Sequence, residues 1–348
     1  MIRQNIAYVG SRTTRERSAR GEGLSVYLAE PATPWRRIQL LDGLINPSFL
    51  AFDRNQDYLY VVHGDQSEIS SFRIEGTGEL TFLGQESTQG RNPVHLSVDP
   101  SNRYVVIANH VTSTLAVLPR RADGSLGPVC DLVELQGEIG PHRVEQPFAK
   151  PHQVQFDPSG GFIAVPDKGL DRTFLFALDD AGRLHQRGTP AISREGFGPR
   201  HMVFHPNGRF AYIVDELSST VTACAFDTAS AKLTPFQIVS NLPDDFVENS
   251  RAAGIALSED GLFLVASNRG HDSIACFDVN TQSGRLTSAG WLSSQGKTPR
   301  FLTFTPWNAI LVANEDTDTI FEMDRTGDAC LVAETGSPVC IIFKSFVI

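Results

Sequence analysis

The chain has 348 residues, of which 41% are hydrophobic and 20% are charged, and its formal net charge is -10. This composition is ordinary for a soluble globular protein, and an acidic chain lacks the basic surface that general nucleic-acid binding requires. No stretch reaches the roughly 18 consecutive apolar residues that a membrane span needs, so we expect neither a nucleic acid nor a membrane as a partner.

Residues 1–5 lack the apolar segment and cleavage site of a secretory signal. The five cysteines are an odd number and lie far apart in the sequence, which fits reduced thiols in a reducing compartment. We therefore expect a cytoplasmic protein. The sequence leaves its oligomeric state open.

The predicted elements begin with strands over residues 6–9, 24–28 and 35–39. A unit that opens with the pattern x-Pro-x-x-apolar-x-apolar then recurs along the chain. Its seven copies are Asn46–Phe52, Asn92–Val98, Lys150–Phe156, Gly198–Phe204, Arg251–Leu257 (with Ala252 in place of the proline), Thr298–Phe304 and Ser337–Phe343. The spacings between equivalent prolines, or their stand-in, are 46, 58, 48, 53, 47 and 39 residues. A unit of this length cannot bury its apolar face alone, so the repeats must pack on one another.

Each unit is predicted to form four strands. A tight turn follows the opening strand, as in Asp99–Asn102, and an apolar strand comes next, as in Tyr104–Ala108. The seventh opening strand has almost no chain after it, whereas the N-terminus supplies three strands without an inner one. We predict an all-β, seven-bladed propeller of four-stranded blades, a single domain over residues 1–348, whose C-terminal strand completes the N-terminal blade. A β-sandwich explains neither the repeat nor the split copy.

Equivalent positions that differ between blades are where a ligand site is expected. The residues directly after the opening proline are Ser48, Val94, His152, Arg200, Ala253, Arg300 and Val339. At the end of the second strand the pairs are His63-Gly64, Asn109-His110, Asp167-Lys168, Asp215-Glu216, Asn268-Arg269 and Asn314-Glu315. The first member of each pair is mostly Asn or Asp, which suits a turn that the side chain closes. The second member varies among charged types, which suits an asymmetric pocket.

A long connection from Asp131 to Gln146 accounts for the 58-residue spacing. Such insertions lie at a face of the fold, where functional groups gather, but they are as often plain surface loops. The sequence leaves its role open.

The chain has no HExxH, paired CxxC or DxDxDG pattern, and no Gly-rich phosphate loop or G-x-S-x-G elbow. We therefore expect no metal and no cofactor. The remaining set suits an acidic substrate whose reaction includes proton transfer, because arginines bind carboxylate or phosphate and offset negative charge on an oxygen, while Glu or His moves the proton. The candidates are His152, Arg200, Glu216 and Arg269 as catalytic residues and His201, Arg300 and His110 as substrate-binding residues.

Three groups of residues carry a resemblance to a known family: Gly198–His201 with His205–Gly208 and Glu216, Ser267–Asp272, and Lys297–Arg300. They resemble the motifs of the seven-bladed propeller lactonases, a family that includes propeller-type 6-phosphogluconolactonases and the fungal 3-carboxy-cis,cis-muconate lactonizing enzyme. The resemblance covers essentially the whole chain, and it implies an active site at His152, Arg200, Glu216 and Arg269. Members often carry Pro-His-x-His in the third blade, where this chain has Val154, and a shorter loop in place of the charged segment Thr13–Arg20.

Three functions remain open. The first is a lactonase that hydrolyses an anionic sugar lactone, with 6-phosphogluconolactone as the expected substrate and Glu216 or His152 activating water. The second is a cycloisomerase that interconverts a carboxylated muconate and its lactone with the same residues. The third is a non-catalytic propeller that binds other proteins. Against the third, the charged asymmetry lies near the channel, where a protein partner does not easily reach.

Overall fold

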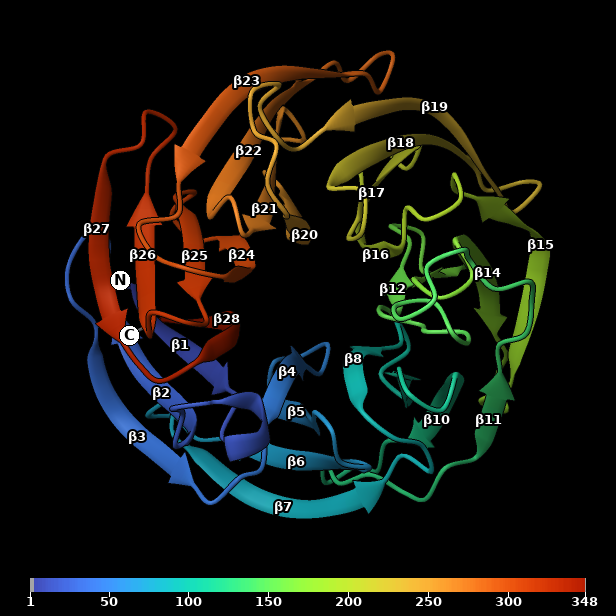
Figure 1. Ribbon diagram of the computed structural model, residues 1–348. Helices are drawn as coiled ribbons and strands as arrows, with labels where there is room; N and C mark the ends of the chain where they lie inside the picture. The colour runs from blue at the N-terminus through green and yellow to red at the C-terminus, as the bar shows by residue number, and fades with distance from the viewer. Residues whose placement is uncertain (1–2, 348) are drawn as a thin grey trace.

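The computed structural model describes residues 3–347, and the first two residues and the last of the predicted 1–348 domain lie outside this range. Within it the strands form seven four-stranded antiparallel sheets arranged in a ring (Figure 1). Each sheet is one blade, as the repeat predicts.

The blades are numbered from the first opening strand. Blade 1 holds β4 (Pro47–Phe52), β5 (Tyr58–His63), β6 (Glu68–Ile74) and β7 (Leu80–Ser87), and blade 2 holds β8 (Pro93–Val98), β9 (Tyr104–Asn109), β10 (Thr114–Pro119) and β11 (Asp131–Glu134). Blade 3 holds β12 (Gln155–Phe156), β13 (Ile163–Asp167), β14 (Arg172–Leu178) and β15 (Leu184–Ile192), and blade 4 holds β16 (Pro199–Phe204), β17 (Phe210–Asp215), β18 (Thr220–Asp227) and β19 (Lys232–Ser240). Blade 5 holds β20 (Arg251–Leu257), β21 (Phe263–Arg269), β22 (Ser273–Val279) and β23 (Leu286–Ser293), and blade 6 holds β24 (Pro299–Phe304), β25 (Ile310–Asn314), β26 (Thr319–Met323) and β27 (Ala329–Glu334). Blade 7 holds β28 (Pro338–Val347), β1 (Arg3–Ser11), β2 (Gly23–Ala29) and β3 (Arg36–Asp42), and a 3-10 turn η1 (Arg15–Arg17) follows β1.

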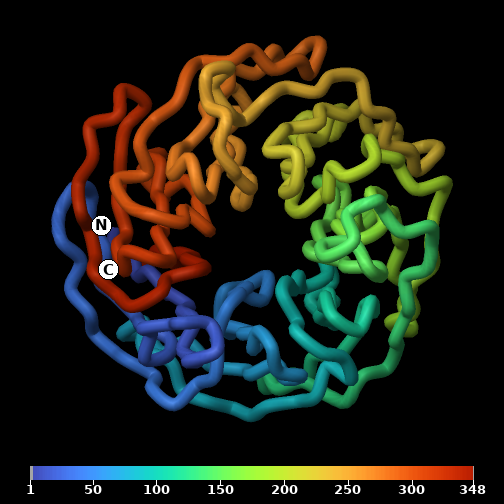
Figure 2. The backbone as a smooth tube through the Cα atoms, viewed as in Figure 1, coloured from blue at the N-terminus to red at the C-terminus, as the bar shows by residue number. Residues whose placement is uncertain are grey.

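The two ends of the chain close the ring. β28 pairs with β1 in an antiparallel ladder from Arg3 opposite Val347 to Ser11 opposite Pro338, so the C-terminal strand is the inner strand of blade 7. Figure 2 shows the two termini side by side. This confirms the predicted closure, which leaves no unpaired inner strand at the seam.

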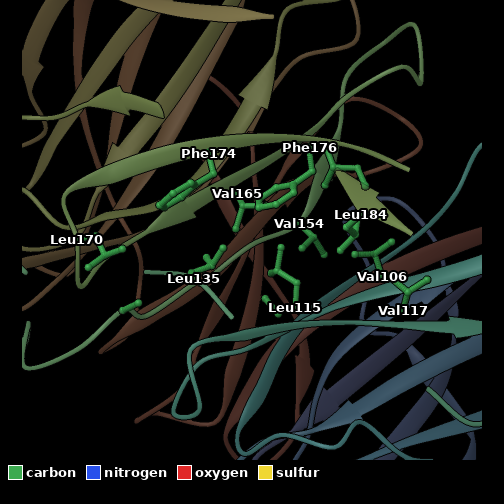
Figure 3. Close-up of a cluster of buried hydrophobic side chains, with 13 residues drawn as sticks. Val106, Leu115, Val117, Leu135, Val154, Val165, Leu170, Phe174, Phe176 and Leu184 are labelled. Atoms are coloured by element: carbon green, nitrogen blue, oxygen red, sulfur yellow. The ribbon is translucent and has the colours of Figure 1, made fainter. Parts of the chain in front are cut away.

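Short turns and cross-blade packing explain why these segments form blades. In blade 1, Asp53 Oδ1 accepts the N–H groups of Asp57 (2.7 Å) and Tyr58 (2.9 Å) and so closes the turn between β4 and β5. The apolar residues of the second and third strands then pack against the next blade. Figure 3 shows one such cluster, in which Val106 and Leu115 of blade 2 meet Val165 and Phe176 of blade 3. Each of the seven blade interfaces in the described chain has a cluster of this kind.

Two predicted boundaries differ from the structure. Residues 131–134 form the outer strand β11 of blade 2, so the true insertion is shorter than predicted and covers the irregular residues from 135 onward. The opening strand predicted over Lys150–Phe156 is regular only at Gln155–Phe156, with an isolated bridge from Pro151 to Asp167. The facing strand β13 contains Pro166, whose missing N–H leaves His152 with a single ladder bond, to the Pro166 carbonyl (3.0 Å).

All five cysteines are free thiols. Within residues 3–347 the structure has no helix that combines the length and apolar character needed to cross a bilayer.

Candidate active site

The inner strands carry a β-bulge at the position of the candidate arginines. In blade 4, Pro199 pairs with Asp215 and His201 pairs with Val214, so Arg200 is the extra residue between them. Blade 6 repeats this with Pro299, Phe301 and the extra residue Arg300. A bulge re-aims the side chain of the residue it inserts. Both arginines consequently line a central cavity of about 320 Å³, together with His152 and His201.

The second-strand ends place the other candidates at the same mouth of the channel. Their Asn and Asp residues are fully buried and hold the loops: Asp215 accepts the hydroxyl protons of Thr222 (2.7 Å) and Thr220 (3.1 Å), and Asn268 donates to the Asn241 carbonyl (2.8 Å). The residue that follows each of them faces its neighbours around the channel. This arrangement brings Lys168, Glu216 and Arg269 of three successive blades together.

Glu216 is the centre of this cluster. Its Oε1 lies 3.1 Å from Lys168 Nζ, and its Oε2 lies 3.1 Å from Arg200 Nε and 3.3 Å from Arg269 Nη2. The side chain is buried, and burial by itself disfavours a carboxylate. The three cations outweigh that effect and hold the pKa of Glu216 well below its usual range. Glu216 is therefore an ionised carboxylate whose oxygens are already engaged.

The histidines form a second group beside Arg200. His152 Nδ1 lies 3.2 Å from His201 Nε2, and the ring of His110 packs edge-on against that of His152 at 5.0 Å. His110 Nδ1 lies 3.2 Å from the Pro151 carbonyl oxygen, so Nδ1 donates to it and Nε2 keeps its lone pair. Burial, followed by the positive charge of Arg200, lowers the pKa of both His152 and His201 well below its usual range. Burial and Lys168 lower the pKa of His110 to about 3. All three imidazoles are neutral at pH 7.

Arg300 belongs to a different cluster. Its Nε lies 3.6 Å from Glu315 Oε2, and Arg12 Nε lies 3.0 Å from Glu315 Oε1. Arg300 shares the channel cavity with Arg200 and His152 but makes no ion pair with Glu216. Of the seven candidate residues, six gather around Glu216 and His152, whereas Arg300 has Glu315 as its carboxylate partner and lies near enough for its charge to act on Arg200.

Three further residues line or contact the site and were not among the candidates. Lys168 stands in the same column of positions as Glu216. His95 of blade 2 lines the cavity, stacks on Phe49 at 3.9 Å and accepts the Val154 N–H at 3.4 Å. Arg12 follows Ser11, which pairs with Pro338 as Asp215 pairs with Pro199. Ser11-Arg12 is therefore the seventh pair of the second-strand column, and aligning the split blade would have found it.

The insertion packs over the cluster. Glu145 lies 3.0 Å from Lys168 Nζ and 2.7 Å from Arg251 Nη1, and Gln146 Nε2 donates to the Lys168 carbonyl (2.8 Å). Although burial disfavours the ionised form, Lys168 and Arg251 lower the pKa of Glu145 to about 2. The insertion is thus tied to the rim of the site and not loose on the surface.

The structure also shows where the chain differs from the family motifs, at Val154 and in the charged segment Thr13–Arg20. Val154 is fully buried in the core between blades 2 and 3, so no side chain from this position enters the channel. The charged segment is anchored to blade 1, because Asn46 Oδ1 accepts the N–H groups of Thr13 (2.8 Å) and Thr14 (3.2 Å) and Arg17 pairs with Asp65. No group of three metal-binding side chains converges within residues 3–347.

Known proteins share this fold and chain length. The family model for "Lactonase, 7-bladed beta-propeller" matches residues 6–343. The chain belongs to this family. It is 36% identical to the 6-phosphogluconolactonase of Bacillus subtilis, with 97% of this chain and 98% of the relative covered. It is 30% identical to an uncharacterized protein of Staphylococcus aureus strain USA300, with 97% and 99% covered. Among solved structures, the periplasmic gluconolactonase of Pseudomonas aeruginosa has a TM-score of 0.87 at 31% identity, with 98% and 99% covered. The chain is therefore a 6-phosphogluconolactonase-like propeller.

Proposed function

We propose that the protein is a lactonase that hydrolyses an anionic sugar lactone, with 6-phosphogluconolactone as the leading substrate. The observation that carries the proposal is a neutral histidine pair, His152 and His201, set in the same cavity as the Arg200 guanidinium. Lactone hydrolysis needs a base for water and a cation for the oxygen that becomes negative, and these groups supply both. The family membership and the names of two relatives point the same way.

In this proposal His152, and not Glu216, is the base. His152 lines the cavity and is neutral, whereas the Glu216 oxygens are held by three cations. His152 donates its Nδ1–H to His201 Nε2, and its own Nε2 takes a proton from water. The water oxygen attacks the lactone carbonyl carbon, and Arg200 stabilises the oxyanion that forms. When the ring C–O bond breaks, the leaving oxygen takes the proton back from His152, which gives the acid and a free hydroxyl group.

Glu216 then acts as the residue that positions the cations. It holds Arg200 and Arg269 from two blades against one oxygen, so its loss would free both guanidinium groups. We assign it no proton transfer. Localisation in the cytoplasm stays a prediction, and one relative of this fold is named as periplasmic.

The test is acid release from freshly generated 6-phosphogluconolactone in a pH-stat, corrected for spontaneous hydrolysis. His152→Ala is expected to lower kcat by about 10²–10⁴-fold, the usual contribution of a general base. His185→Ala is the matched control, because His185 is half exposed on the outer strand β15, where it pairs with Asp179. A wild-type rate equal to background would exclude this substrate and move the muconate cycloisomerase and the binding platform forward. A near-native rate for His152→Ala would refute the assigned base.

A further inference from the structure

The channel contains two copies of one ionic arrangement, in neighbouring parts of the ring. The first copy consists of Arg200 and Glu216 of blade 4 with Arg269 of blade 5. The second copy consists of Arg300 and Glu315 of blade 6 with Arg12 of blade 7, which follows blade 6 in the ring (Figure 1). In both, a bulged inner-strand arginine and a second-strand arginine of the next blade flank one glutamate.

The distances in the two copies are similar. Glu216 Oε2 lies 3.1 Å from Arg200 Nε and 3.3 Å from Arg269 Nη2. Glu315 Oε1 lies 3.0 Å from Arg12 Nε, and Glu315 Oε2 lies 3.6 Å from Arg300 Nε. The strand register makes the correspondence positional: Pro299 pairs with Asn314 as Pro199 pairs with Asp215. The two charged trios therefore occupy equivalent positions of the blade repeat.

The copies differ in the groups that could move a proton. Arg200 is followed by His201, which bonds to His152 of the preceding blade. Arg300 is followed by Phe301, and the preceding blade carries Ala253 at the position of His152. The second trio can hold an anion, but at these positions it has no imidazole that could act as a base.

Arg12 is the part of the second trio that most needs a partner. It is 6% exposed and lines the channel cavity, as Arg300 does. Although its Nε and Nη1 are within ion-pair distance of Glu315 and Asp65, no acceptor in the described chain is aligned to take a hydrogen bond from either nitrogen. Buried donors without acceptors are rare in folded proteins, because leaving them unpaired is costly. A ligand oxygen in the cavity would satisfy them.

The charge balance favours an anion. Three guanidinium groups, those of Arg12, Arg17 and Arg300, face two carboxylates, those of Asp65 and Glu315. Burial and the nearby Arg300 lower the pKa of Arg12 to about 9, so Arg12 stays protonated at neutral pH. Two guanidinium groups around one pocket match the oxygens of a phosphate monoester, which they bind through paired donors.

We propose that Arg12 and Arg300 form a second anion subsite, which binds the phosphate of the substrate while the lactone carbonyl lies at Arg200 and His152. The proposal rests on the proposed lactonase function and adds to it the residues that bind the phosphate of the substrate. One ligand can reach both subsites because Arg12, Arg300, Arg200 and His152 line the same cavity of about 320 Å³, a size at the small end of the usual range for ligand sites, roughly 300–1,000 Å³.

The test compares 6-phosphogluconolactone with glucono-δ-lactone, which lacks the phosphate, for wild type, Arg12→Met and Arg300→Met. Each variant is expected to lower kcat/KM about 10–100-fold on the phosphorylated lactone, mainly through KM, as loss of a charged hydrogen bond predicts. The same variants should change kcat/KM on glucono-δ-lactone by less than about 3-fold, because no phosphate is present to be bound. Arg36→Met is the control, since Arg36 is an exposed arginine on the outer strand β3 of the same blade and does not line the cavity. Equal losses on both lactones, or no loss on either, would overturn the subsite.

A binding measurement separates this proposal from the lactonase proposal. Calorimetric titration with 6-phosphogluconate and with gluconate requires no turnover. Wild type should bind 6-phosphogluconate more tightly, and Arg12→Lys, which keeps the charge, should reduce that preference at least about 10-fold with little change in Tm. If wild type hydrolyses no lactone but still prefers 6-phosphogluconate, the lactonase proposal fails and the subsite stands. If it binds both acids equally, the subsite fails.

Discussion

His152 Nδ1 and His201 Nε2 lie 3.2 Å apart across the boundary between blades 3 and 4. One ring must donate and the other must accept, so the contact requires at least one neutral imidazole. Burial and the nearby Arg200 lower the pKa of each ring, which favours the neutral form of both. A base buried beside a fixed cation thus stays unprotonated under conditions where a free histidine would not.

The activity should therefore show little acid inhibition near neutrality. A histidine base with the ordinary pKa of about 6.5 would lose most of its activity between pH 7 and pH 5.5. Because the pKa of His152 lies well below its usual range, we expect kcat/KM for the lactone to change less than about 2-fold over this interval. Background-corrected initial rates at constant ionic strength would measure it. A fall of about 8-fold over this interval, with an apparent pKa near 6.5, would contradict the assignment.

The same histidines should make the fold sensitive to acid. His95 and His110 have their pKa lowered to about 3 by burial, and the pKa of His152 and His201 is lowered in the same direction. Above pH 6.5 neither the folded nor the unfolded chain protonates them. Below pH 6.5 the unfolded chain takes up protons that the folded chain excludes, so stability falls as pH falls, by at most about 1.4 kcal/mol per pH unit for each histidine.

Urea unfolding at pH 7.5, 6 and 5 would measure this slope. His95→Phe, which keeps a ring against Phe49, should reduce the slope between pH 6 and pH 5 by about one histidine's share, up to roughly 1.4 kcal/mol per pH unit. An unchanged slope would mean that His95 takes up its proton in the folded protein.

Ring closure makes a prediction about the C-terminal strand. β28 pairs with β1 along its length and contributes the buried residues Val339, Cys340 and Ile341. Deleting residues 338–348 removes these side chains, each worth about 1.5–3 kcal/mol when large and fully buried, and exposes the edge of β1. We expect the truncated chain to lose its cooperative thermal transition. Val347→Ser, at a position that is 65% exposed, should leave Tm almost unchanged, and a truncated chain with native Tm would contradict the closure.

The repeat predicted the blades and the candidate residues because both depend on local pattern. The opening proline is followed by a bulge in blades 1, 2, 4 and 6, and in blades 4 and 6 the inserted residues are Arg200 and Arg300, which line the cavity. Arg12 was missed for a physical reason: its blade is split between the two chain ends, so its strand had no inner partner nearby in sequence. The contacts of Glu145 could not be predicted either, because they belong to an irregular segment that no other blade repeats.

Arg200 offers the sharpest test of the site as a whole. Its Nη1 donates to the Ala253 carbonyl (2.6 Å) while its Nε lies 3.1 Å from Glu216 Oε2, so the planar guanidinium spans two blades. Lysine keeps the charge but cannot make both contacts and still face the cavity. We expect Arg200→Lys to lower kcat about 10²–10³-fold, as loss of an oxyanion donor does. Steady-state kinetics on the lactone and Tm would be measured together.

Arg209→Lys is the matched control, because Arg209 is an exposed arginine of the same blade whose side chain donates to the Gln282 carbonyl (3.1 Å) and does not line the cavity. If Arg200→Lys retained more than half of the wild-type activity, positive charge alone would suffice at this position, and the guanidinium geometry would have no part in the reaction.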